Sequence, residues 1–136
     1  MDIYLLPNER QALTDYRPPM HTKTIVVRLN LQYGPQAHAM DVQAGACLIG
    51  RDDDCRLKVD HRLVSRRHAS IESVAGKFFL HDHSTNGTYV EERNQGKPVF
   101  VQREIYQLNG SGVISLGIEP RHNPGHLITF TLGFGG

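Results

Sequence analysis

Hydrophobic and polar positions alternate along most of the chain after the first two dozen residues. Over residues 24–32, Ile25, Val27, Leu29 and Leu31 alternate with mostly polar neighbours, which is the period of two expected of a half-buried β-strand. The same alternation, or a short apolar run that ends near a turn, predicts further strands at 39–42, 47–49, 57–59, 69–74, 77–81, 88–90, 99–101, 105–108, 113–116 and 127–132.

Turn residues separate these strands, and a helical period is absent. Ala75-Gly76 and Gly110-Ser111-Gly112 interrupt the apolar runs, and Asn86-Gly87 is a strong signal for a hairpin turn. No stretch has the apolar period of 3.6 that an amphipathic helix requires. Short strands at such intervals are typical of an all-β sandwich, in which the inner faces form the core and loops at one end carry the function.

Residues 1–21 do not share this pattern. Pro7, Pro18 and Pro19 divide a polar stretch without a sustained period, which predicts a linker or flexible N-terminal segment with one short helical turn around Glu9–Asp15. The remaining residues, 22–136, have the length of one domain.

Composition and charge exclude several classes of protein. The chain has 15 basic and 14 acidic residues, whereas a general nucleic-acid binder carries a larger basic excess. No apolar run approaches the about 18 residues of a membrane span, and the N-terminus lacks the basic region of a signal peptide. Two cysteines are too few for a disulfide scaffold, so we expect reduced thiols and a cytoplasmic location.

Three polar segments, 50–54, 65–68 and 82–88, each follow or precede a predicted strand. A sandwich could therefore present them together at one end. They offer guanidinium groups, hydroxyl groups and the backbone N–H groups of a turn, which together are the chemistry that holds a phosphate. The side chains concerned are Arg51, Ser65, Arg66, Arg67, Ser84, Thr85 and Thr88.

Three short motifs, taken in their order along the chain, also resemble those of a known protein family. Gly50-Arg51, then Ser65-x-x-His68, then Ser84-Thr85-Asn86-Gly87-Thr88 resemble the forkhead-associated (FHA) domain, one of the families that read phosphorylated motifs with arginine clusters. The resemblance covers residues 24–132. It implies an FHA-type β-sandwich of about eleven short strands with the peptide-binding loops at one end.

The resemblance also implies a role for each of five residues in binding phosphothreonine. Arg51 and Arg66 are expected to contact the phosphate. Ser65 is expected to donate its hydroxyl group to a phosphate oxygen, and Thr85 to frame the pocket. Asn86 is expected to hydrogen-bond the backbone of the bound peptide and fix its register.

Three further residues are expected to support the site without touching the phosphate: Gly50, His68 and Gly87. The family prefers phosphothreonine to phosphoserine, and one buried methyl group is worth about 0.8 kcal/mol. The expected partner is a phosphothreonine-containing protein, in cis or in trans, with no cofactor and no enzymatic activity. The identity of the partner, the kinase, the flanking selectivity and the oligomeric state stay open.

Several alternatives compete with this interpretation. Residues 103–117 resemble the FHA modules attached to bacterial class III adenylate/guanylate cyclases, so the chain could be a regulatory or interaction module of a larger protein that does not depend on phosphate. Ser65, His68 and Asp82 could be drawn as a hydrolase triad, but a triad is defined by geometry and no nucleophile elbow is present. The eight histidines, including His81 and His83, show no spacing that specifies a metal site.

Overall fold

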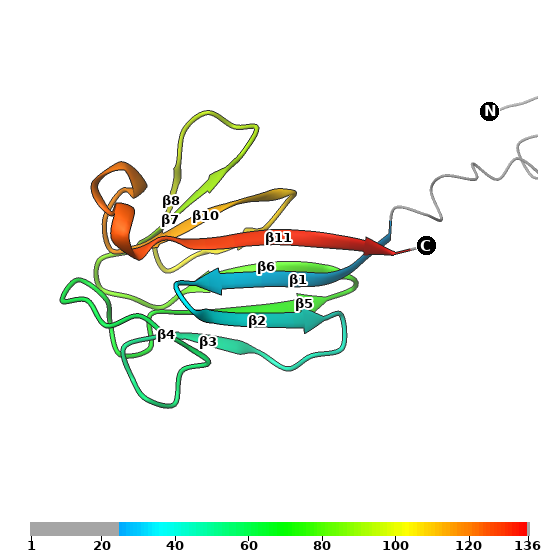
Figure 1. The fold of residues 1–136 in the computed structure, drawn as a ribbon, viewed down its shortest axis with the longest axis horizontal. Coiled ribbons are helices and arrows are strands. Elements are labelled where there is room, and N and C mark those ends of the chain that lie inside the picture. The colour runs from blue at the N-terminus through cyan, green and yellow to red at the C-terminus, as the bar shows by residue number, and fades with distance from the viewer. Residues whose placement is uncertain (1–24, 136) are drawn as a thin grey trace, which may run out of the picture.

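The structure, a computed structural model, describes residues 25–135 as eleven β-strands and two short 3-10 helices (Figure 1). The prediction of an all-β fold is confirmed. The linker and the helical turn that the sequence predicted within residues 1–21 lie outside the described residues. In the part of the chain that is described, no helix is long and apolar enough to cross a membrane.

The strands form two sheets. The first has six strands in the order β2 (Gln36–Asp41), β1 (Ile25–Tyr33), β11 (Ile128–Gly135), β10 (Ser111–Leu116), β7 (Thr88–Glu92) and β8 (Val99–Val101). The second has five in the order β4 (Leu57–Lys58), β3 (Cys47–Gly50), β5 (Ala69–Val74), β6 (Lys77–Asp82) and β9 (Ile105–Gln107). All neighbouring strands are antiparallel except β3 and β4, which are parallel.

The core lies between the inner faces of the two sheets. In β6, Phe78, Leu80 and Asp82 are buried while the residues between them are partly exposed, because successive side chains of a strand point to opposite faces. From the other sheet, Ile114 and Phe130 are also fully buried or nearly so. Each large apolar side chain removed from water contributes about 1.5–3 kcal/mol, which makes the sandwich a rigid support for its loops.

The β1–β2 hairpin is longer than the sequence predicted. Strand β2 begins at Gln36, three residues before the expected start, and Gln36 pairs with Tyr33 across a two-residue turn. Apolar alternation misses residues 36–38 because the backbone ladder to β1, and not burial, holds them in the sheet. The two 3-10 helices, Pro120–His122 and Pro124–His126, are likewise too short for periodicity to reveal.

The turn signal at Asn86-Gly87 does not close a hairpin. Strand β6 pairs with β5 and β9 in one sheet, whereas β7 pairs with β10 and β8 in the other. The β6–β7 loop therefore carries the chain from one sheet to the other at the end of the sandwich. The β3–β4 and β4–β5 loops emerge at this same end (Figure 1), which is where the polar motifs lie.

Candidate functional site

The β3–β4 and β4–β5 loops are fastened to each other through their backbones. The N–H of Arg51 donates to the carbonyl of Ser65 at 3.1 Å, and the N–H of Asp52 donates to the carbonyl of Arg66 at 3.1 Å. Gly50 makes this approach possible, since a Cβ at this position would lie 2.2 Å from the Arg66 carbonyl oxygen. The glycine of the first motif is thus required by the backbone of the second.

His68 joins the β4–β5 loop to the β6–β7 loop. Its Nδ1 accepts a hydrogen bond from the backbone N–H of Ser65 at 3.0 Å, so Nε2 carries the ring hydrogen and donates it to the carbonyl of Gly87 at 2.8 Å. The ring is fully buried, and burial lowers the pKa of His68 below its ordinary value. A neutral imidazole is the form that both contacts require.

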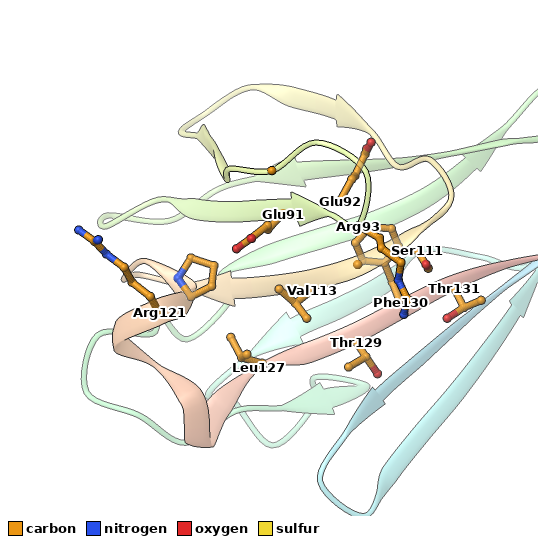
Figure 2. Close-up of a pocket in the computed structure, with 13 residues that line it drawn as sticks. Glu91, Glu92, Arg93, Ser111, Val113, Arg121, Leu127, Thr129, Phe130 and Thr131 are labelled. Carbon is orange, nitrogen blue, oxygen red and sulfur yellow. The ribbon is translucent and has the colours of Figure 1, made fainter.

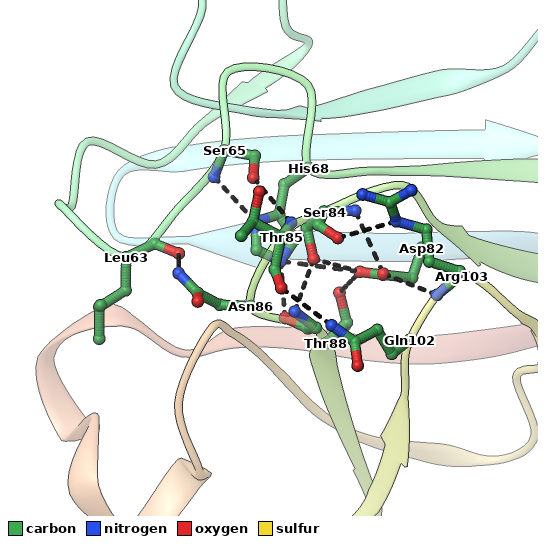
Figure 3. Close-up of polar contacts among 11 residues, drawn as sticks. Leu63, Ser65, His68, Asp82, Ser84, Thr85, Asn86, Thr88, Gln102 and Arg103 are labelled. Carbon is green, nitrogen blue, oxygen red and sulfur yellow. Dashed lines mark hydrogen bonds and ion pairs between the residues drawn. The ribbon is translucent and has the colours of Figure 1, made fainter.

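Asp82, at the end of β6, is the buried anchor of the β6–β7 loop (Figure 3). Its carboxylate accepts hydrogen bonds from the backbone N–H and hydroxyl of Ser84, the hydroxyl of Thr88 and the backbone N–H of Arg103, at 2.7–3.1 Å. Burial by itself raises the pKa of Asp82, but these hydrogen bonds outweigh it and hold the pKa below its ordinary value.

Ser84 and Gly87 shape the tip of this loop. The Ser84 hydroxyl donates to Asp82 at 2.7 Å and accepts the backbone N–H of Gly87 at 2.7 Å. Gly87 has a φ of 86°, and a Cβ there would lie 2.2 Å from the Phe100 ring, so the turn needs glycine on both counts. The two residues between them, 85 and 86, are left exposed at the tip.

Ser65, Thr85 and Asn86 lie close together where the β4–β5 and β6–β7 loops meet (Figure 3). The Ser65 hydroxyl oxygen accepts the backbone N–H of Thr85 at 3.2 Å, which leaves its own hydrogen available to a ligand. The Asn86 amide donates one N–H to the carbonyl of Leu63 at 3.1 Å. The other amide N–H and the amide oxygen of Asn86 have no partner among residues 25–135.

The arginines beside these groups differ in their pairing. Arg67 forms ion pairs with Asp54 at 2.6 Å and Asp52 at 3.8 Å. Arg51 and Arg66 are exposed, and no acidic side chain within residues 25–135 pairs with either. The Nε of Arg51 instead donates to the carbonyl of Val64. Arg51 and Arg66 thus follow Gly50 and Ser65 in two loops that are joined through their backbones, and neither guanidinium group has an acidic partner in the described part of the chain, which favours an anion.

The hydrolase alternative is not supported by this geometry. Both ring nitrogens of His68 are engaged with backbone groups, Nδ1 with the N–H of Ser65 and Nε2 with the carbonyl of Gly87. A general base would have to accept the hydrogen of the Ser65 hydroxyl, and His68 has no ring nitrogen left for that contact. Within residues 25–135 no group of three or more His, Cys, Asp or Glu side chains is placed to hold a metal ion.

The structure brings together at one end of the sandwich all eight residues that the sequence singled out: Gly50, Arg51, Ser65, Arg66, His68, Thr85, Asn86 and Gly87. Sequence analysis missed the anchoring role of Asp82, although Asp-x-Ser is a spacing at which a carboxylate caps a turn. It also missed Gln102 and Arg103, whose contacts with the β6–β7 loop are long-range and leave no local signal.

A cleft of about 460 Å³ lies on another part of the surface, across β7, β10 and β11 (Figure 2). Its lining mixes charges of both signs with small side chains, among them Glu91, Arg93, Val113, Thr129 and Thr131. None of the eight residues above lines it. The loop site instead presents exposed side chains, among them Arg51, Arg66, Thr85 and Asn86.

Comparison with known proteins decides the family. The family model of the FHA domain matches residues 47–117, just over half of the chain and including all three motifs. This chain belongs to the FHA domain family. No curated protein matches this chain significantly.

Solved structures of FHA domains share the fold. FHA-1 of the Mycobacterium tuberculosis protein Rv1747 is 22% identical, with a TM-score of 0.61 over 79% of this chain and 98% of that one. An FHA structure from work on phosphothreonine-dependent FHA domain interactions is 28% identical, with a TM-score of 0.55 over 78% and 97%. The FhaA FHA domain complexed with the intracellular domain of Rv3910 is 29% identical, with a TM-score of 0.53 over 75% and 98%.

Proposed function

We propose that this FHA domain binds phosphothreonine in partner proteins and so makes a protein–protein contact depend on phosphorylation. One observation carries the proposal. The loops at one end of the sandwich carry two exposed arginines that have no acidic partner among residues 25–135, Arg51 and Arg66, and a hydroxyl group that donates to no described residue, that of Ser65. These donors suit a phosphate monoester, which carries a charge of about −1.5 to −2 and three strong acceptor oxygens.

The five site residues divide the work of binding. Arg51 and Arg66 supply charge, and Ser65 supplies a directed hydrogen bond to a phosphate oxygen. Thr85 frames the side of the pocket next to the phosphothreonine methyl group. Asn86 uses the amide groups that Leu63 leaves free to hold the peptide backbone, which fixes the register of the bound segment.

The similar structures support this proposal. One of them comes from work on phosphothreonine-dependent FHA interactions, and another is a complex with the intracellular domain of a partner protein. We infer that this domain is an interaction module in signalling, bound in cis or in trans, and that it holds a phosphopeptide without hydrolysing it. Incubating a phosphothreonine peptide with the protein and measuring released phosphate checks the last point. Turnover would contradict it.

The binding test compares a phosphothreonine peptide, selected from an oriented library, with its unphosphorylated twin by fluorescence anisotropy. The Arg51→Ala variant should bind the phosphopeptide roughly 30-fold or more weakly, because a hydrogen bond to a charged group contributes about 2 kcal/mol or more. Arg93→Ala is the matched control, since Arg93 is an exposed arginine of the distant cleft, and it should bind like the parent.

Two results would contradict the proposal. Equal affinity for the peptide and its unphosphorylated twin would favour the phosphate-independent interaction module. Equal affinity of the parent and the Arg51→Ala protein would remove Arg51 from the site.

A further inference from the structure

The short turn between β8 and β9, residues 102–104, holds the β6–β7 loop through side-chain hydrogen bonds. Gln102 Nε2 donates to the carbonyl of Thr85 at 2.8 Å, and Arg103 Nε donates to the carbonyl of Ser84 at 3.1 Å. The backbone N–H of Arg103 is itself held by the buried carboxylate of Asp82 at 2.9 Å. Two consecutive carbonyl groups of the β6–β7 loop thus accept hydrogen bonds from the same neighbouring turn.

Drawing a carbonyl to one side also sets the direction of the N–H on the same peptide unit. A trans peptide is planar, with its C=O and N–H pointing in opposite directions, and the described residues contain no cis peptide. The unit between Ser84 and Thr85 shows the consequence. Its carbonyl accepts from Arg103, and its N–H points the other way to the hydroxyl oxygen of Ser65.

The next peptide unit, between Thr85 and Asn86, is anchored at one end only. Its carbonyl accepts from Gln102, which lies on the opposite side of the loop from Ser65 (Figure 3). The backbone N–H of Asn86 has no hydrogen-bond acceptor among residues 25–135. It must point away from Gln102, toward the surface where the exposed tip of the loop would meet a ligand.

We propose that Gln102 is a positioning residue that turns the backbone N–H of Asn86 toward the bound phosphopeptide, where it donates a hydrogen bond. This inference rests on the proposed function, since the acceptor belongs to the phosphopeptide. The tip of the loop is exposed, so without Gln102 the peptide unit can rotate and satisfy both of its groups with water. Gln102 therefore pre-organises a donor that binding would otherwise have to order.

The variant Gln102→Met tests this directly, because methionine keeps the length and neutrality of the side chain and removes the donor. Gln107→Met is the matched control, since Gln107 lies on the neighbouring β9 and, among residues 25–135, its side-chain amide donates only to Asn109. Gln102 is exposed and Gln107 is partly exposed, so both variants should unfold close to the temperature of the parent. The probe is the phosphothreonine peptide selected for the parent, with its unphosphorylated twin.

Two readouts are taken together. Gln102→Met should bind the phosphopeptide about tenfold more weakly than the parent and Gln107→Met, the loss of one hydrogen bond to an anionic ligand. In ¹H–¹⁵N spectra, the Asn86 backbone amide should move strongly downfield on binding in the parent and in Gln107→Met. That shift should be much smaller in Gln102→Met.

The outcomes separate this inference from the proposed function. If the parent fails to bind the phosphopeptide in preference to its twin, the proposed function itself fails. If the parent binds but Gln102→Met binds equally well, or loses affinity while the Asn86 amide still shifts as in the parent, the positioning role of Gln102 is wrong and phosphothreonine binding stands.

Discussion

Asp82 is the carboxylate around which the β6–β7 loop folds, and its removal is the most demanding stability test of the site. In an Asp82→Ala variant, four donors lose their acceptor at once: the N–H and hydroxyl of Ser84, the hydroxyl of Thr88 and the N–H of Arg103. The hydroxyl groups can rotate toward other acceptors. The two backbone N–H groups cannot, because the loop and the β8–β9 turn hold their directions.

The magnitude follows from these two backbone donors. A buried donor left without a partner costs about 1–3 kcal/mol, toward the lower end where water can reach it. The N–H of Ser84 is buried and that of Arg103 is partly buried, so Asp82→Ala should lower the free energy of unfolding by about 2–4 kcal/mol. This is a large share of the about 5–15 kcal/mol that a typical domain has.

The variant Asp82→Asn should be milder, with a loss of about 1–2 kcal/mol. The amide oxygen can take the place of Oδ2 and accept both backbone N–H groups. Its NH₂ then faces the hydroxyls of Ser84 and Thr88, which can turn their hydrogens away and accept. The charge-assisted strength of the original contacts is still lost.

Urea unfolding at neutral pH gives the free energy of unfolding of the parent, Asp82→Ala and Asp82→Asn. Asp53→Ala is the control. Asp53 is an exposed aspartate whose side chain contacts only Lys58 among the described residues, so its removal should leave the transition midpoint close to that of the parent. If Asp82→Ala lost less than about 1 kcal/mol, below the range expected for unsatisfied buried donors, or if Asp82→Asn were as unstable as Asp82→Ala, the anchoring role of Asp82 would be refuted.

Two further predictions concern residues that hold the loops together. Because burial lowers the pKa of His68, the unfolded chain binds more protons below about pH 6.5, and stability should rise with pH toward that value by up to about 1.4 kcal/mol per unit. Between pH 5 and 8, the unfolding midpoint should rise less with pH in His68→Gln than in the parent. The same pH dependence in both proteins would contradict a neutral His68 ring. Gly50→Ala should cost about 2 kcal/mol or more in urea unfolding, because its Cβ meets the Arg66 backbone; parent-like stability would show that the loops can separate freely.

The site has an inner and an outer layer with different duties. The inner layer consists of His68, Asp82 and Ser84, which are fully buried and whose hydrogen bonds tie the loops together. The outer layer consists of exposed or half-buried side chains with unused donors, such as Ser65 and Asn86. The inner layer orders the loops in advance, so the ligand does not have to order them on binding.

Local sequence signals predicted most of the strands, because each strand has a buried face that repeats every second residue. They failed where a backbone ladder alone holds the chain, as at Gln36, and where a turn signal does not say which strands it joins. Asn86-Gly87 has the composition of a hairpin turn, yet the strands on either side of it lie in different sheets. Only the pairing of distant strands distinguishes the two cases.

The sequence placed the candidate site residues on three loops, and the structure brings these loops together, but the pairing of their side chains could not be predicted. Arg66 and Arg67 are adjacent, and composition alone makes either one a candidate for the phosphate. The structure pairs Arg67 with Asp54 and leaves Arg66 without an acidic partner among residues 25–135. The role of Gln102 could not be predicted from the local sequence either, because its contact with Thr85 spans 17 positions and depends on where β8 ends.

The most direct measurement of the central claim is a ¹H–¹⁵N titration of the protein with a phosphothreonine peptide and, separately, with its unphosphorylated twin. The phosphopeptide should perturb backbone amides in residues 50–54, 65–68 and 82–88 and leave those lining the cleft of Figure 2 unchanged. The twin should perturb none of them at the same concentration. Perturbations centred on the cleft, or equal perturbations by both peptides, would contradict the assignment of the three loops as a phosphothreonine site.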